Sequence, residues 1–160
     1  MTTIFRFLPL LALGVWLGAI ALSFIVAPGI FALMPTRQQA GAVVGLILAR
    51  LHLLGYVCAA IYLGVALAQR RAEISSEKYA ALLVVAMLLL TLVSQQWITP
   101  RLGDLRAQMV SSFGSIDQTP QDHALRRAFG RLHGMSSLLE LLVLLCGLAA
   151  FYLHYRASPH

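Results

Sequence analysis

The stretch RLHGMSSLLELLVLLCGLAAFYLHY, residues Arg131–Tyr155, is long and apolar enough to cross a bilayer as a helix, and it carries a single acid, Glu140. Four of its polar side chains recur at i, i+3, i+4 and i+7: His133, Ser136, Ser137 and Glu140. A helix gathers positions with this spacing on one face. Because an ionisable side chain inside a membrane is costly and normally faces the protein interior, this face is the strongest candidate for a functional site.

The composition of the whole chain is that of a membrane protein. Of its 160 residues, 59% are hydrophobic and only 11% are charged, which lies outside the range of soluble globular proteins. We therefore expect an integral, multi-pass protein, in a bacterial inner (plasma) membrane, whose main partner is the lipid bilayer. The formal net charge of +6 fits loops that face anionic headgroups. No basic run is interleaved with aromatic residues, so nucleic acid is not expected as a partner.

Four spans are predicted, at about residues 7–28, 49–69, 79–99 and 132–155, in a single domain covering residues 1–160. The first could also be read as a secretory signal, but its apolar region is too long for one. Residues 101–118 predict an amphipathic helix or loop at the interface, or a kinked extension of the third helix. The expected fold class is an all-α, integral membrane four-helix bundle.

Proline and threonine mark the expected ends of these helices. Pro28 and Pro35 should end or kink the first helix near the membrane surface. Thr36 opens a capping box, and Thr119 precedes a proline and an acid, so each should begin a helix that starts outside the bilayer.

The two halves of the chain follow a similar order. Each has an apolar helix ending in proline, a threonine cap, and a long helix that enters the membrane at Arg-Leu-His, residues 50–52 and 131–133. This order predicts a bundle built from two parallel two-helix repeats, with both tripeptides at one membrane face. Basic residues divide almost evenly between the two faces, so the positive-inside rule does not orient the protein.

The two histidines of these tripeptides, His52 and His133, are candidate metal ligands. Two imidazoles entering the bilayer at matching depths could form an axial pair for haem or a partial copper site, with Met135 as a soft neighbour. Their rings would then have to converge. The alternative is that both histidines contact lipid headgroups, beside Arg50 and Arg131.

Glu140 should point into the bundle. It lies at a depth comparable to that of Gln95 on the preceding span, so we expect it to meet Gln95, Ser94 or Thr91. With no basic residue expected at that depth, the neutral acid should be favoured. A polar track through Gln95, Ser137 and Glu140 could then relay a proton or hold a small cation. The alternative is interhelical hydrogen bonding that only fixes helix register.

Five short segments, in this order along the chain, resemble the transmembrane protein 205 family: GVWLG (14–18), APGIF (27–31), AG (40–41), PR (100–101) and LHGMSS (132–137). The resemblance implies a four-span domain of unsettled biochemical function, with a loose link to metal handling or membrane traffic, and it supplies no catalytic residues. Where the family pattern has a neutral amide, this chain has Glu140. The layout is also similar to copper-resistance D-type and protoporphyrinogen-oxidase-type membrane proteins, which implies helix histidines that hold metal or haem.

Enzymatic activity is not the expected function. The sequence contains no Ser-His-Asp, paired-carboxylate, phosphate-loop or zinc-finger pattern. A scaffold or assembly factor is a further alternative, because small residues let a neighbouring helix approach closely. The glycines that would serve in a homo-oligomer, or against another membrane protein, are Gly14, Gly18, Gly41 and Gly45. The same four glycines fit packing inside the bundle equally well.

Overall fold

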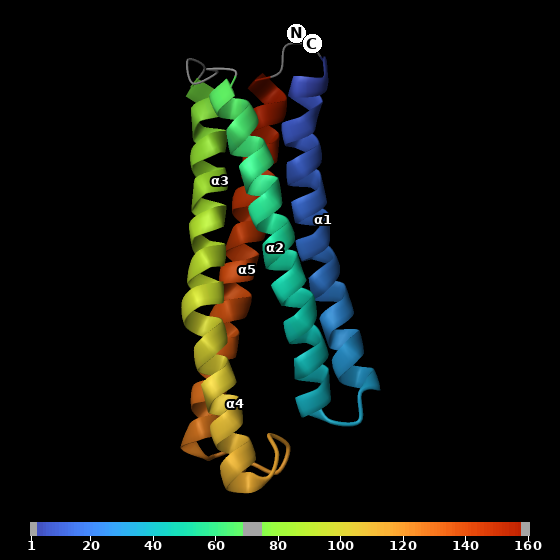
Figure 1. The fold of residues 1–160 in the computed structure, drawn as a ribbon, viewed down its shortest axis with the longest axis vertical. Coiled ribbons are helices and arrows are strands. Elements are labelled where there is room, and N and C mark those ends of the chain that lie inside the picture. The colour runs from blue at the N-terminus through green and yellow to red at the C-terminus, as the bar shows by residue number, and fades with distance from the viewer. Residues whose placement is uncertain (1–2, 69–74, 158–160) are drawn as a thin grey trace.

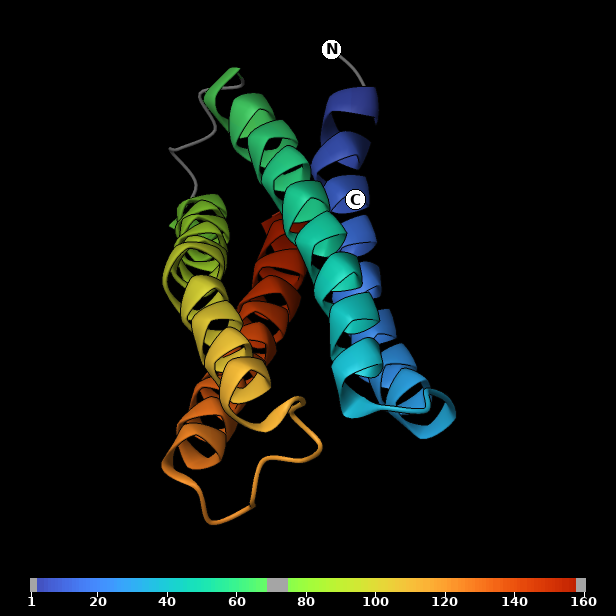
Figure 2. The same cartoon turned by 60° about the horizontal axis from the view of Figure 1, so that its bottom comes forward.

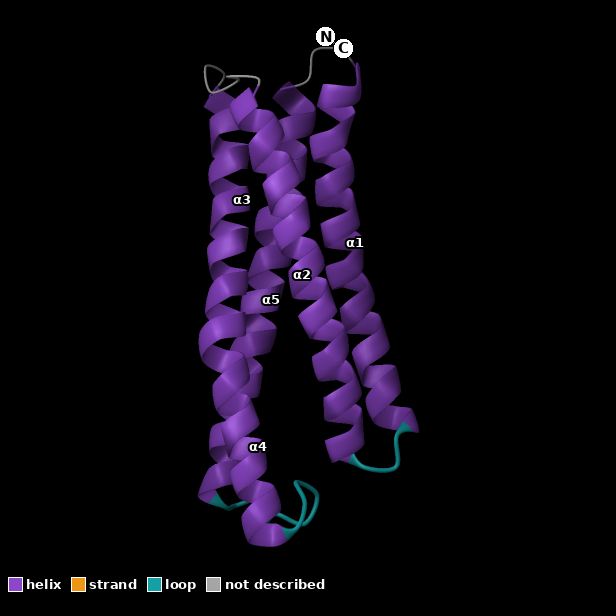
Figure 3. Cartoon of the chain, in the orientation of Figure 1, coloured by secondary structure: helices purple, strands orange, loops and turns teal. Residues whose placement is uncertain are grey.

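The computed structural model describes residues 3–68 and 75–157. Its elements are α1 (Thr3–Leu33), α2 (Arg37–Ala68), α3 (Ser75–Val93), the π-helical turn η1 (Ser94–Ile98), α4 (Thr99–Phe113) and α5 (Ala124–Ala157). The described part of the chain contains no strand (Figure 3). The all-α helical bundle predicted from the sequence is therefore confirmed.

The helices run alternately up and down, with the start of α1 and the end of α5 at one end of the bundle (Figure 1). α3, η1 and α4 follow one another without a break and form one long rod. α3 packs most extensively on α5, and α1 on α2. These two pairs diverge toward the end opposite the termini, as Figures 1 and 2 both show. α2 and α5 run in the same direction, as two parallel two-helix repeats would require. The repeat itself stays a prediction.

Within the described residues, four helical segments are long and apolar enough to cross a membrane: Phe7–Leu33, Arg37–Ala68, Ser76–Phe113 and Ala124–Arg156. Large apolar side chains on them are exposed, among them Leu33 at 86% and Leu67 at 79%. A soluble protein does not expose a surface of this kind, whereas lipid covers it without cost. The chain is an integral membrane protein.

The first predicted helix cap is confirmed and the second is wrong. Thr36 Oγ1 accepts a hydrogen bond from the amide of Gln39 at 3.2 Å, and α2 begins at the next residue. The hydroxyl of Thr119 instead donates to the carbonyl oxygen of Ser115 at 3.0 Å, so it is engaged in the preceding turn. α5 begins five residues later, at Ala124, and Nδ1 of His123 accepts from the amide of Leu125 at 3.3 Å.

The other helix ends also differ in detail from the sequence expectation. α1 continues through Pro28 and ends at Leu33, just before Pro35. Of the alternatives for residues 101–118, the structure has an extension of the third helix as far as Phe113, followed by a loop that begins at Gly114 with φ 79°. Residue 69, where the second span was predicted to end, lies outside the described residues.

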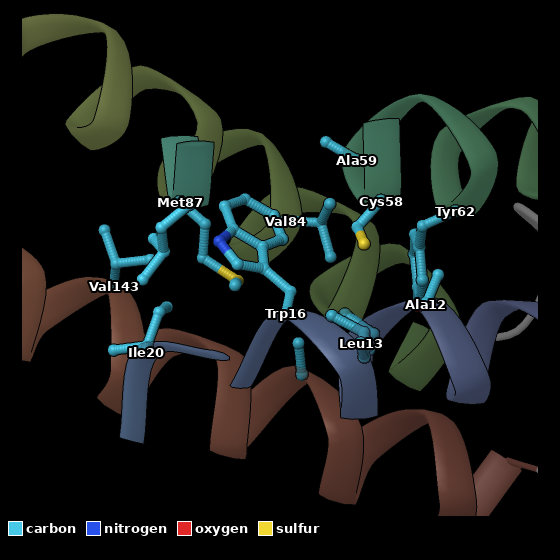
Figure 4. Packing of buried hydrophobic residues seen from close by; sticks show 13 residues of the cluster. Ala12, Leu13, Trp16, Ile20, Cys58, Ala59, Tyr62, Val84, Met87 and Val143 are labelled. Carbon is cyan, nitrogen blue, oxygen red and sulfur yellow. The ribbon is translucent and has the colours of Figure 1, made fainter. Parts of the chain in front are cut away.

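The apolar core lies in the half of the bundle nearer the termini, where all four long helices meet. Its largest fully buried side chains include Trp16 and Ile20 from α1, Met87 from α3 and Val143 from α5 (Figure 4). Trp16 reaches α2 because Gly55 has no side chain. A Cβ at Gly55 would lie 2.7 Å from the indole ring, closer than non-bonded atoms approach.

Candidate functional site

His52 lies on the inward face of α2. The buried residues of this helix recur with helical spacing: Ala40, Leu51, His52, Gly55, Cys58, Ala59, Tyr62 and Val65. His52 is only 4% exposed. A polar ring held in this apolar stripe needs partners from other helices, because a buried polar group without a hydrogen bond is costly.

One partner is Gln95, which η1 carries into reach of α2. In this wide turn the amide of Thr99 donates to the carbonyl oxygen of Ser94, five residues earlier. Pro100 explains why the turn is wide. It has no amide hydrogen, and in a regular α-helix its ring would clash with the carbonyl of Gln96. Pro100, just after the third predicted span, is therefore the sequence signal for this turn.

The contact with Gln95 fixes the hydrogen on His52. Nδ1 of His52 lies 2.8 Å from Oε1 of Gln95. An amide oxygen only accepts hydrogen bonds, so Nδ1 carries the hydrogen and donates it. The other ring nitrogen, Nε2, then has a lone pair if the ring is neutral, and a second hydrogen only if the ring is an imidazolium.

The other partner is Glu140 of α5, whose Oε2 lies 3.5 Å from Nε2 of His52. This is within ion-pair range and longer than the roughly 3 Å of a good hydrogen bond. Glu140 is 9% exposed, which confirms that it points into the bundle. The prediction that Glu140 meets Gln95, Ser94 or Thr91 is wrong, because His52 lies between Gln95 and Glu140. The expectation that no basic group shares the depth of Glu140 is wrong for the same reason.

Gln95, His52 and Glu140 form a chain of contacts across three helices, which we call the central polar cluster. Because Nδ1 is engaged with Gln95, a proton exchanged in this cluster would be held by Nε2 or by the carboxyl group. It makes either an imidazolium with a carboxylate or a neutral ring with a neutral acid. Both forms have no net charge. Losing this proton would leave a bare carboxylate in a buried site, and gaining a second would leave a cation there.

The family described as a domain of unknown function (DUF4149) matches residues 11–111, more than half of the chain. The chain belongs to the DUF4149 family. The matched residues include His52 and Gln95 and end before α5, which carries Glu140. Comparison with curated proteins and with solved structures found no match. The more specific resemblance to transmembrane protein 205 stays a prediction.

Two further polar groups of this DUF4149 chain are buried near the cluster, and neither is among the site residues predicted from the sequence. Nε1 of Trp16 and the hydroxyl of Tyr56 have no hydrogen-bond partner among the described residues, and neither has Oε1 of Glu140. Trp16 packs over Gly55, one turn after His52 on α2, and Tyr56 is four residues after His52. Tyr56 could have been found from this i, i+4 spacing.

The remaining candidate residues lie outside the cluster. His133 is exposed and stacks on Phe129, with ring centroids 6.2 Å apart. Ser137 is also exposed, and its hydroxyl donates to the carbonyl oxygen of His133 at 3.1 Å. Ser136, one turn before Glu140 on the same face, is half-buried, and its hydroxyl lies 3.5 Å from that of Ser94. The face is therefore covered at Glu140 and Ser136 and open at Ser137 and His133. Arg50 and Arg131 are exposed as well.

The structure does not bring the two histidines of the paired-imidazole hypothesis together, because His52 is buried against Glu140 and His133 faces outward. Within the described residues, no group of three His, Cys, Asp or Glu side chains could hold a metal ion. Metal or haem binding through His52 and His133 stays a prediction.

The glycines of the scaffold hypothesis lie mostly on open surface. A Cβ at Gly14, Gly18 or Gly45 would meet no atom within 4 Å, so packing inside the bundle does not require these three glycines. Gly41 differs, because the guanidinium of Arg106 on α4 lies 2.8 Å from the position of its Cβ. An oligomer or a second membrane protein as a partner stays a prediction.

Proposed function

We propose that this DUF4149 protein takes up and releases a proton inside the bilayer, at the contact between His52 and Glu140. The observation that supports the proposal is the position of His52, whose two ring nitrogens face an amide oxygen at 2.8 Å and a carboxyl oxygen at 3.5 Å. Buried histidine and carboxyl groups are the usual parts of proton relays in membrane proteins. Gln95 orients the ring, Nε2 exchanges the proton, and Glu140 balances its charge.

The gap between Nε2 and Oε2 favours exchange over a fixed structural bond. At 3.5 Å the pair is close enough for electrostatic attraction and too far apart for a strong hydrogen bond. Oε1 of Glu140 faces no protein hydrogen-bond donor among the described residues, so the carboxyl group keeps an acceptor for an incoming water. If the cluster served only to fix helix register, a neutral amide in place of the acid would serve equally well.

Proton flux into liposomes tests the proposal. The purified protein is reconstituted with a pH-sensitive dye trapped inside, and a potassium gradient with valinomycin supplies the driving potential. We expect flux above that of empty liposomes, loss of this flux in Glu140→Gln, and full flux in Ser137→Ala, whose serine is exposed on the same helix. Wild-type protein without flux, or Glu140→Gln with wild-type flux, would contradict the proposal.

A further inference from the structure

A cavity of about 530 Å³ lies between α2 and α3, in the half of the bundle that holds the termini. Its lining includes Val65 and Leu67 from α2, and Ala81 and Leu82 from α3. Tyr62 also lines it, ten residues after His52, which is about 15 Å along the helix. The cavity is therefore separate from the central polar cluster. Its volume is in the range of small-molecule sites, about 300–1,000 Å³.

The walls of this cavity are apolar, and its rim faces the lipid. Leu67 and Leu82, on opposite sides of it, are 79% and 62% exposed. A molecule dissolved in the bilayer can therefore reach the cavity sideways. An apolar body would fill it without desolvating polar groups.

Three hydrogen-bonding side chains meet at the cavity. The hydroxyl of Tyr62 lies 3.1 Å from Nδ1 of His154, and their rings make an edge contact at 5.5 Å. Both side chains are buried, and so is Glu77, which lines the same cavity. An apolar pocket with a few convergent polar groups is the usual form of a binding site.

We propose that this cavity binds a neutral amphiphile from the membrane, with an apolar body and a hydroxyl end group. A hydroxyl both donates and accepts, which matches the tyrosine hydroxyl, the imidazole and the carboxyl group around it. A carboxylate or phosphate end group would be repelled by the Glu77 carboxyl group whenever that group is ionised. Lys78, the one Lys or Arg side chain among the described lining residues, is exposed.

Photolabelling in liposomes tests this site. The probe is a long-chain alcohol that carries a diazirine, and mass spectrometry locates the adducts. We expect adducts concentrated on α2 and α3 around the cavity, reduced severalfold by unlabelled alcohol and by Ala81→Phe, which fills the cavity. Leu89→Phe is the matched control, because Leu89 is on the same helix, exposed, and outside the lining.

The end group is tested with the conservative variant Tyr62→Phe, which keeps the ring and removes the hydroxyl. Labelling by the alcohol should fall severalfold in this variant, and labelling by a diazirine alkane should not change. Even labelling of all lipid-facing helices, or stronger labelling by the corresponding fatty acid, would overturn the proposal. Glu140→Gln should label like the wild type. A negative labelling result would therefore leave the proton-exchange proposal unaffected, and an absence of proton flux would leave the cavity proposal unaffected.

Discussion

Nδ1 of His52 and Oε1 of Gln95 lie 2.8 Å apart, and this hydrogen bond joins α2 to the π-helical turn between α3 and α4. It has two consequences. It orients the imidazole so that Nε2 faces Glu140, and it makes Nδ1 the donor, so that Nε2 is the nitrogen free to exchange a proton. The wide turn that brings Gln95 into reach is thus part of the site.

Gln95→Leu should lower the free energy of unfolding by about 1–3 kcal/mol, because it leaves the Nδ1 hydrogen of His52 without its acceptor. Gln96→Leu is the matched control. Gln96 is the next residue and is exposed, so its replacement should change stability by no more than about 0.5 kcal/mol. Denaturant unfolding in detergent micelles measures both. Equal stability of the two variants would argue against the hydrogen bond.

Gly55→Ala should destabilise the bundle by about 1–3 kcal/mol, because the added methyl group would displace the ring of Trp16 from the core. Gly45→Ala, on the same helix, meets no atom within 4 Å and should be neutral or stabilising by up to about 1 kcal/mol. Thermal unfolding of the two variants compares them directly. A stabilised Gly55→Ala protein would show that Trp16 is not packed against α2.

Two features could be predicted from the sequence because neither depends on which helices pack together. The cap at Thr36 depends on residues within one turn, and the inward direction of Glu140 follows from the cost of a charge in lipid. The partner of Glu140 could not be predicted, because it depends on how α2 packs against α5. The exposure of His133 depends on where the two helix pairs diverge. The spacing of polar residues within one helix does not indicate that position.

Arg126 holds the loop between α4 and α5. Its Nη1 donates to the carbonyl oxygens of Ile116 and Thr119, the latter at 3.1 Å. Arg126→Ala should therefore raise amide hydrogen exchange across residues 114–123, because two carbonyls lose a charged donor. Arg127→Ala is the control, since Arg127 is exposed. Unchanged exchange in Arg126→Ala would mean that other contacts hold the loop.

Metal or haem binding is tested by an optical spectrum and elemental analysis of the detergent-purified protein. The paired-imidazole hypothesis predicts that His52→Ala and His133→Ala each abolish the bound group. Because His133 is exposed and stacked on Phe129, we expect His133→Ala to leave the spectrum and the metal content unchanged. Loss of a stoichiometric metal or haem in both variants would instead support the paired site.

Infrared difference spectroscopy of the reconstituted protein, recorded as the pH is cycled, tests most directly whether His52 and Glu140 share a proton. A shared proton predicts a reversible carboxylic-acid carbonyl band that is absent in Glu140→Gln. It also predicts that His52→Gln shifts the pH at which this band changes, because the proton then has no imidazole to share. A carbonyl band that persists in Glu140→Gln, or one that does not respond to His52→Gln, would contradict a shared proton at this site.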